Sequence, residues 1–205
     1  MANQWKKSIK PFALTKRIDV VPVWHKKIYK RNQRTPVYID SVNAFGTGLH
    51  ETTRFMAELI EDCQGRFTSF LDVGTGSGIL SMVALKSQAK EVFAIDNDKN
   101  CLPAAQTNLK ANGLNFQSLK AVDLKNYNPK MSFDFVAANL YSQDLIDMKQ
   151  KLFTLVKPGR YLAISGVSLT NLKKVQEAYK KLKLRSLKLK KGQKWVALFY
   201  KRQES

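Results

Sequence analysis

From residue 67 onward, short apolar runs alternate with segments whose apolar side chains recur every three or four residues. The runs predict β-strands and the periodic segments predict amphipathic helices, because side-chain direction repeats every two residues in a strand and about every 3.6 in a helix. The predicted strands span residues 67–73, 91–96, 116–119, 133–139 and 161–166. The predicted helices span residues 79–87, 99–112, 144–156 and 171–180.

The last part of the chain follows a different pattern. Residues 184–190 alternate leucine with basic side chains, a Lys-Gly-Gln turn follows, and residues 195–200 are apolar. This pattern predicts an antiparallel hairpin with one buried face. The alternation of strand and helix before it predicts a parallel sheet with right-handed crossovers. We therefore expect an α/β fold of the Rossmann-like, doubly wound type, with a mostly parallel seven-stranded sheet and a C-terminal antiparallel hairpin.

The first 43 residues lack this regular alternation. They predict a basic N-terminal segment, irregular apart from short β-like pieces at residues 18–23 and 36–39. A glycine-containing loop and a helix over residues 52–63 follow, and Gly65 ends that helix. We therefore expect residues 44–205 to form the functional domain.

Composition sets limits on the class of protein. A chain of 205 residues is within the size of one domain. The two cysteines, Cys63 and Cys101, form no CxxC and no metal-ligand spacing, so we expect reduced packing thiols and no metal. No apolar signal region and no run of about 18 apolar residues appears, which predicts a cytoplasmic protein without a membrane span.

Charge is unevenly distributed along the chain. The formal net charge is +19, and the excess lies near the two ends. Ten basic residues accompany Asp19 between Lys6 and Arg34, and twelve accompany Glu177 between residues 173 and 202. Such ends favour a polyanionic partner such as RNA, because Lys and Arg release counterions when they contact phosphates. A general enrichment in lysine is the alternative, since Lys predominates over Arg.

The turn after the first regular strand carries the clearest chemical signal. Asp72 is followed by glycines at positions 74, 76 and 78. A dinucleotide fingerprint needs its third glycine one residue later, where this chain has Ile79. A carboxylate at Asp72 would repel a pyrophosphate but suits a ligand that carries an ammonium group. With close backbone approach at Gly74 and Gly76, the turn predicts a sulfonium nucleoside site; a tight turn without a ligand is the alternative.

Two further carboxylates follow the next two strands. Asp96 ends a strand, a position from which a carboxylate accepts hydrogen bonds from both ribose hydroxyls. Asp98 competes for this role, although it also suits a helix cap. Asp123 follows the short third strand and could accept from an adenine amino group; a simple turn-forming role is the alternative.

Several stretches together resemble the PrmA family, the methyltransferases that modify a ribosomal protein of the large-subunit stalk base. The matching stretches are residues 10–12, 22–24, 44–53, 72–80, 95–98 and 136–140. The resemblance implies a class I methyltransferase fold and S-adenosylmethionine as cofactor. It also implies that Thr53, Gly74, Asp96 and Asn139 contact that cofactor.

The sequence departs from the family pattern in three ways. Leu49 stands where the family usually has threonine, and Asn139-Leu140-Tyr141 stands where it usually has Asn-Ile-Leu. Full-length members also carry a separate N-terminal domain that grips the ribosomal substrate, and we expect this sequence to lack it. The implied cofactor and reaction therefore carry over from the family, whereas the departures concern the substrate.

Each remaining site residue allows two interpretations. The Asn139 amide could orient the acceptor amine or the methionine moiety, or it could cap its strand. Thr53 could donate to the methionine carboxylate or cap a helix. Phe45 could pack over the cofactor near its sulfonium or fill space beneath the loop.

Two neighbours of these residues, His50 and Tyr141, also bear on the site. His50 is interpreted as a residue that structures its loop rather than as a general base. Tyr141 is a candidate for the lining of the acceptor pocket, from its position two residues after Asn139.

We expect an S-adenosylmethionine-dependent methyltransferase that acts on amino groups of a ribosomal protein or a ribosome-associated substrate. An RNA methyltransferase is one alternative, although the Asn/Asp-Pro-Pro-aromatic stretch of base-amine enzymes is absent after residue 139. The other alternative is a non-catalytic ribosome- or RNA-binding protein on the same fold.

Overall fold

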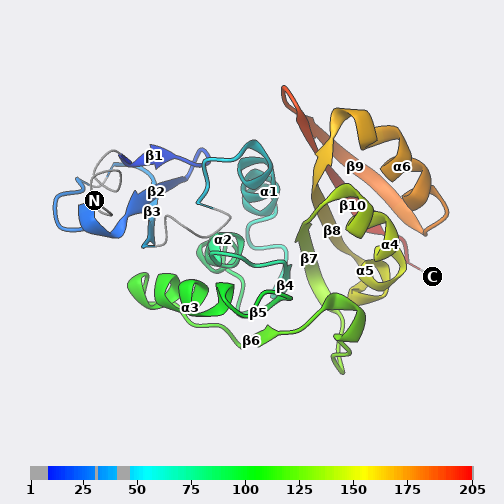
Figure 1. The fold of residues 1–205 in the computed structure, drawn as a ribbon, viewed down its shortest axis with the longest axis horizontal. Helices are drawn as coiled ribbons and strands as arrows, with labels where there is room; N and C mark the ends of the chain where they lie inside the picture. The colour runs from blue at the N-terminus through cyan, green and yellow to red at the C-terminus, as the bar shows by residue number, and fades with distance from the viewer. Residues whose placement is uncertain (1–8, 31, 41–46, 205) are drawn as a thin grey trace.

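The computed structural model describes residues 9–30, 32–40 and 47–204. Its main sheet has seven strands in the spatial order β6-β5-β4-β7-β8-β10-β9 (Figure 1). The strands are β4 (Ser69–Val73), β5 (Glu91–Asp96), β6 (Ser118–Ala121), β7 (Phe133–Asn139), β8 (Val156–Ser168), β9 (Leu184–Lys191) and β10 (Trp195–Arg202). The first five in chain order run parallel, whereas β10 is antiparallel to both β8 and β9. The predicted fold class is confirmed.

Helices cover both faces of this sheet (Figure 1). One face packs against α1 (Glu51–Asp62) and α2 (Ile79–Lys86), with α3 (Cys101–Ala111) beyond them, and the other against α4 (Ser142–Asp147), α5 (Lys149–Leu155) and α6 (Leu172–Lys180). Successive strand residues point to opposite faces, so Phe70 joins the first core and Leu71 the second. Both side chains are fully buried. This alternation explains why the central strands are apolar throughout.

The N-terminal segment forms a small sheet of its own. Strand β2 (Ile18–Pro22) pairs with β1 (Phe12–Ala13) in antiparallel and with β3 (Thr35–Ile39) in parallel orientation, and a short 3-10 helix, η2 (Val23–His25), follows β2. The two β-like pieces expected from the sequence are present, but their parallel pairing was not foreseen.

Amide side chains of α3 and of the residue that ends it fasten this small sheet to the main domain. Asn112 Oδ1 accepts from the Tyr38 N–H at 2.8 Å, and Asn112 Nδ2 donates to the Tyr38 carbonyl at 2.7 Å. Asn108 Oδ1 accepts from the Asp40 N–H at 2.8 Å. Val20 and Val37 are buried in the same core as α1 and α2. The domain boundary at residue 44 stays a prediction.

The helix expected over residues 144–156 is two short helices, α4 and α5, which meet at Met148. The Met148 backbone (φ −93°, ψ 3°) leaves the α-helical region there. The second helix ends at Leu155, before the Pro158-Gly159 pair that was expected to stop it. Val156 is fully buried and already pairs with Phe133, so Pro158 and Gly159 lie in an irregular part of β8.

The remaining short helices are η3 (Leu124–Asn126) and η4 (Leu169–Asn171). Within the described ranges, no helix combines the length and the apolar composition that crossing a lipid bilayer requires.

Candidate functional site

A cleft opens at the carboxyl ends of the central parallel strands. Strand β4 lies between β5 and β7, and the chain leaves it in one direction toward β5 and β6 and in the other toward β7 and β8. Ligands of doubly wound sheets bind at such a switch point. The cleft is lined by Val73, Gly74, Ile95, Asp96, Asn97, Val122, Asp123, Leu124, Lys125, Leu140, Asp144 and Met148. Three of the residues singled out from the sequence, Gly74, Asp96 and Asp123, are therefore brought together.

The Asp96 carboxylate connects two strand ends. Its Oδ2 accepts from the Gly76 N–H at 2.9 Å and its Oδ1 from the Asp98 N–H at 2.9 Å. The side chain is largely buried but lines the cleft, so each oxygen keeps a lone pair for a further donor. Asp98, by contrast, is exposed and accepts from Asn100 at the start of α3. The geometry therefore favours Asp96 over Asp98 as a ligand for ribose hydroxyls.

Asp72 lies behind the glycine turn and organises it. Its Oδ2 accepts from the Thr75 hydroxyl at 2.9 Å, the Ser81 hydroxyl at 2.7 Å and the Ser81 N–H at 3.1 Å. Burial raises the pKa of this carboxyl to about 6, against the opposing effect of these three hydrogen bonds. The residue expected to face a ligand ammonium thus also connects the turn to the start of α2.

Gly74 has a backbone conformation that favours glycine. Its φ is +73°, and a Cβ atom would lie 2.6 Å from Leu140 Cδ2. The backbone N–H groups of Gly74 and Thr75 donate to the Ile95 carbonyl at 2.9 and 3.1 Å, which holds the turn against β5. The backbone at Gly74 therefore forms part of the cleft wall.

Asp123 lies at the far end of the same cleft. Its Oδ1 accepts from the Lys125 N–H at 2.7 Å and so caps η3. The side chain is exposed and lines the cleft. Asp123 therefore has the turn-forming role, and its position in the cleft lining is compatible with a role in ligand binding.

Asn139 ends β7 and contacts the first turn of α1. Its Nδ2 donates to Thr52 Oγ1 at 3.2 Å, and Thr52 Oγ1 lies 2.8 Å from His50 Nδ1. His50 is the N-cap of α1, because its Nδ1 accepts from the Thr52 N–H at 3.4 Å. This geometry fits the interpretation of His50 as a structuring residue.

Thr53 supplies an unusual polar atom beside this contact. The side chain is 1% exposed, and its Oγ1 is buried without a hydrogen-bond partner. A buried hydroxyl without a partner costs about 1–3 kcal/mol, and such groups are rare except where a ligand or water completes them. The hydroxyl is therefore suited to donate to a bound anionic group.

Two other residues were singled out from the sequence, Phe45 and Tyr141. Phe45 lies outside the described residues. Tyr141 is 73% exposed and directly precedes α4. Its ring is thus on the surface next to Asn139 rather than part of a closed pocket.

Sequence reasoning missed the neighbours that hold Asn139. Thr52 was present in a matching stretch but was not connected to Asn139, which is 87 positions away in the chain. Trp195 contacts His50 with ring centroids 5.3 Å apart, and it comes from the C-terminal hairpin, where no local pattern indicates a role.

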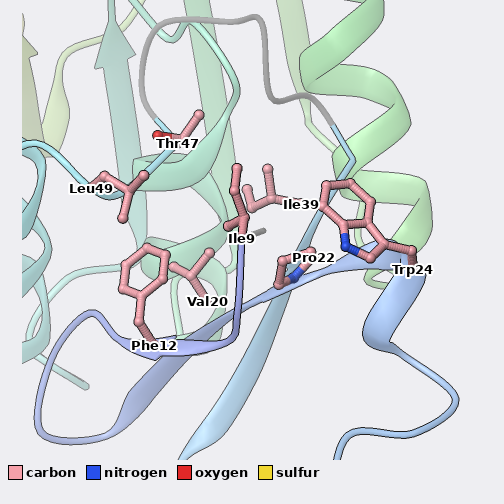
Figure 2. Close-up of a pocket in the computed structure, with 8 residues that line it drawn as sticks. All are labelled: Ile9, Phe12, Val20, Pro22, Trp24, Ile39, Thr47 and Leu49. Carbon is pink, nitrogen blue, oxygen red and sulfur yellow. The ribbon is translucent and has the colours of Figure 1, made fainter. Parts of the chain in front are cut away.

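A second pocket lies between the small N-terminal sheet and the loop at residues 47–49 (Figure 2). Its lining is almost entirely apolar: Ile9, Phe12, Val20, Pro22, Trp24, Ile39, Thr47 and Leu49. It offers no titratable group for chemistry among these residues. In the described part of the chain, no group of three His, Cys, Asp or Glu side chains could hold a metal ion.

Known proteins were compared with the chain. A family model described as ribosomal protein L11 methyltransferase (PrmA) matches residues 1–203. A ribosomal protein L11 methyltransferase of Sorangium cellulosum is 36% identical over 167 residues, which are 80% of this chain and 52% of that protein. One of Listeria innocua is 33% identical over 202 residues, 98% of this chain and 64% of that protein. The chain thus spans between half and two thirds of these relatives' lengths.

Solved structures show the same similarity. A crystal structure of a ribosomal protein L11 methylase from Lactobacillus delbrueckii subsp. bulgaricus superposes with a TM-score of 0.87 at 27% identity, covering 96% of this chain and all of that one. The N-methyltransferase NodS from Bradyrhizobium japonicum, in complex with S-adenosyl-L-homocysteine, has a TM-score of 0.65 at 13% identity, covering 80% of this chain and 94% of that one. The second similarity concerns the fold alone.

Proposed function

The chain belongs to the ribosomal protein L11 methyltransferase (PrmA) family, and on this premise we propose that it transfers methyl groups from S-adenosylmethionine to amino groups of a ribosomal protein. The matches to the family model and to the Listeria innocua relative confirm the resemblance noted from the sequence. The observation that carries the proposal is the cleft where Gly74 and Asp96 meet, with Asn139 at the end of the neighbouring strand.

Two side chains of the cleft and one buried hydroxyl would bind this cofactor. Asp96 would accept from the ribose hydroxyls, and Asp123 from the adenine amino group. The partnerless Thr53 hydroxyl, which is not among the residues that line the cleft, would donate to the methionine carboxylate. These groups match the ribose, the adenine amino group and the carboxylate of the cofactor.

The turn and the Asp72 carboxylate complete the proposed site. Backbone at Gly74 and Gly76 would lie against the cofactor, since Gly74 lines the cleft and neither glycine has a side chain. Asp72 would stabilise the cofactor's ammonium group through its field. When bound, S-adenosylmethionine supplies a methyl group already activated by sulfonium.

The protein's own task is alignment. An acceptor amine must arrive neutral, because only a free lone pair can form the new bond. Asn139 would accept one N–H of that amine and point the lone pair along the line of displacement. The nitrogen–carbon bond would form as the bond from the methyl carbon to sulfur breaks, with its electron pair left on sulfur, and the amine proton would pass to solvent.

Labelled S-adenosylmethionine incubated with the protein and ribosomes, subunits or free ribosomal proteins tests the proposal. Label on a ribosomal protein supports it, whereas label on RNA would favour the RNA methyltransferase alternative. Asn139→Ala should lower kcat about 100-fold, within the range for a group that orients a reacting amine. Asn128→Ala, on the surface away from the cleft, is the matched control. A normal rate and normal cofactor affinity for Asn139→Ala would remove Asn139 from the site.

A contact with RNA is a second part of the proposal. It is supported by exposed basic side chains around and beyond α6, among them Lys173, Lys181, Lys183 and Arg185, for which the described residues offer no ion pair. The logarithm of the binding constant for ribosomal RNA should fall linearly with the logarithm of the salt concentration. A flat salt dependence would contradict this contact. The proposed substrate class also implies that the protein acts in the cytoplasm, where ribosomal proteins are made.

A further inference from the structure

The hydrogen bonds around Thr52 determine which way the Asn139 amide faces. His50 Nδ1 lies 3.4 Å from the Thr52 N–H and 2.8 Å from the Thr52 hydroxyl oxygen. A backbone N–H is always a donor, so Nδ1 must be an acceptor and carry no proton. The neutral ring therefore carries its proton on Nε2.

The His50 tautomer determines where the Thr52 hydroxyl donates its proton. With Nδ1 as an acceptor, the hydroxyl donates its single proton to His50, and its oxygen is left to accept. Asn139 lies 3.2 Å from that oxygen and must present its NH₂ group. Its Oδ1 thus remains available, and no described residue donates to it.

The C-terminal hairpin keeps His50 in place. The ring of Trp195 meets the His50 ring edge-on, with centroids 5.3 Å apart and planes at 65°. Glu51 accepts from the Gln193 N–H at 3.2 Å and from the Trp195 N–H at 3.3 Å, which ties the hairpin turn to the start of α1. A Cβ atom on Gly192 would overlap the Glu51 carboxylate, so a larger residue there would require the Glu51 side chain to move.

We infer that Thr52 and His50 are positioning residues for the methyl acceptor, because together they turn the Asn139 amide so that its oxygen faces an incoming N–H. The inference rests on the proposed function, in which Asn139 orients the acceptor amine. In the opposite orientation the amide would present two donor hydrogens, which cannot accept from an amine. The hydroxyl of Thr52 is the element that selects between the two orientations.

The tautomer of His50 can be measured without any activity assay. The chain has two histidines, and ¹⁵N-histidine labelling with a His25→Gln variant assigns both ring systems. The inference requires that neutral His50 carries its proton on Nε2 and has an unprotonated, hydrogen-bonded Nδ1. A protonated Nδ1 in the neutral ring would overturn it, whatever the protein's activity.

Paired variants of Thr52 test the catalytic consequence. Thr52→Val removes the acceptor for Asn139 at nearly constant shape and should lower kcat at least tenfold, with cofactor affinity and the unfolding midpoint close to those of the native chain. Thr52→Ser restores the hydroxyl and should keep kcat within about threefold of the native value. A purely structural role would move the unfolding midpoint instead.

The outcomes separate the two proposals. Impaired turnover in Asn139→Ala combined with a native kcat in Thr52→Val overturns the positioning role and leaves the proposed function intact. Native turnover in Asn139→Ala removes Asn139 from the proposed function itself. Equal losses in Thr52→Val and Thr52→Ser would also contradict the inference, because the hydroxyl would then not be the property that matters.

Discussion

The Asp96 carboxylate accepts a hydrogen bond from the backbone N–H of Gly76 at 2.9 Å, although the two residues are 20 positions apart. This bond joins the end of β5 to the glycine turn that follows β4. The group proposed to bind the ribose therefore also fixes the turn that forms the adjoining cleft wall, and the two parts of the proposed cofactor site depend on each other.

Replacing Asp96 should accordingly weaken cofactor binding strongly. Asp96→Ala removes acceptors for two ribose hydroxyls, and hydrogen bonds to a charged group contribute about 1.5–3 kcal/mol each. The Kd for S-adenosylmethionine should rise about 100-fold or more by calorimetry. Asp98→Ala removes an exposed carboxylate of the same loop and should change Kd by less than about threefold. Equal effects of the two substitutions would show that the assignment of Asp96 is wrong.

Thr53→Val should separate stability from binding. The hydroxyl is buried and unpartnered, so a methyl group of the same shape should leave the free energy of unfolding unchanged or raise it by about 1 kcal/mol. If the hydroxyl donates to the methionine carboxylate, cofactor affinity should fall about tenfold in the same variant. Urea unfolding and calorimetry measure the two effects, and unchanged affinity would contradict the proposed role.

Asp72 should make stability depend on pH in a defined window. Burial raises its pKa to about 6 from the usual 3.8, so the folded protein keeps a proton that the unfolded chain has lost between these values. The free energy of unfolding should therefore fall as pH rises from about 4 to 6, by about 3 kcal/mol at about 1.4 kcal/mol per pKa unit.

Asp72→Asn isolates this contribution from that of other carboxyl groups. The variant should gain stability relative to the native chain as pH rises through the window, and the difference should level off above about pH 7. Urea unfolding at several pH values measures it. A difference independent of pH would mean that Asp72 titrates near its usual value.

Glycine positions with the same backbone conformation should respond differently to alanine. Gly166 and Gly113 have φ of +86° and +65°, so alanine at either costs about 1–2 kcal/mol for conformation alone. A Cβ at Gly166 would also overlap the carbonyl oxygen of Leu140, whereas nothing lies within 4 Å at Gly113. Gly166→Ala should therefore be the more destabilising by at least about 2 kcal/mol in urea unfolding, and similar losses would contradict this account of the Leu140 backbone.

The regular part of the fold could be predicted because each strand and helix has its own pattern of apolar residues in the sequence. Asp72, the glycines and Asp96 lie at strand ends, and parallel strands end at one edge of a sheet, so their convergence followed from the pattern. The attachment of β3 to the main domain could not be predicted in this way, because its backbone is bound by the amides of Asn108 and Asn112, which lie far along the chain.

The break between α4 and α5 was missed for a similar reason. Leu145 and Leu152 belong to one apolar face that continues on both sides of Met148, so the apolar period alone does not reveal the break. The contact between Asn139 and Thr52 was missed because it joins two elements across the sheet edge, and no sequence spacing encodes it. Residue types predict the chemistry proposed for the site, whereas the tertiary structure determines which side chains hold one another.

The central claim is that the cleft at Gly74 and Asp96 binds a sulfonium nucleoside and not a pyrophosphate dinucleotide. Titration calorimetry with S-adenosylmethionine and, separately, with NAD⁺ tests it most directly. We predict one S-adenosylmethionine bound per chain with a Kd well below millimolar and no heat from NAD⁺. Absence of binding by S-adenosylmethionine at millimolar concentration, or binding of NAD⁺ in its place, would contradict the account.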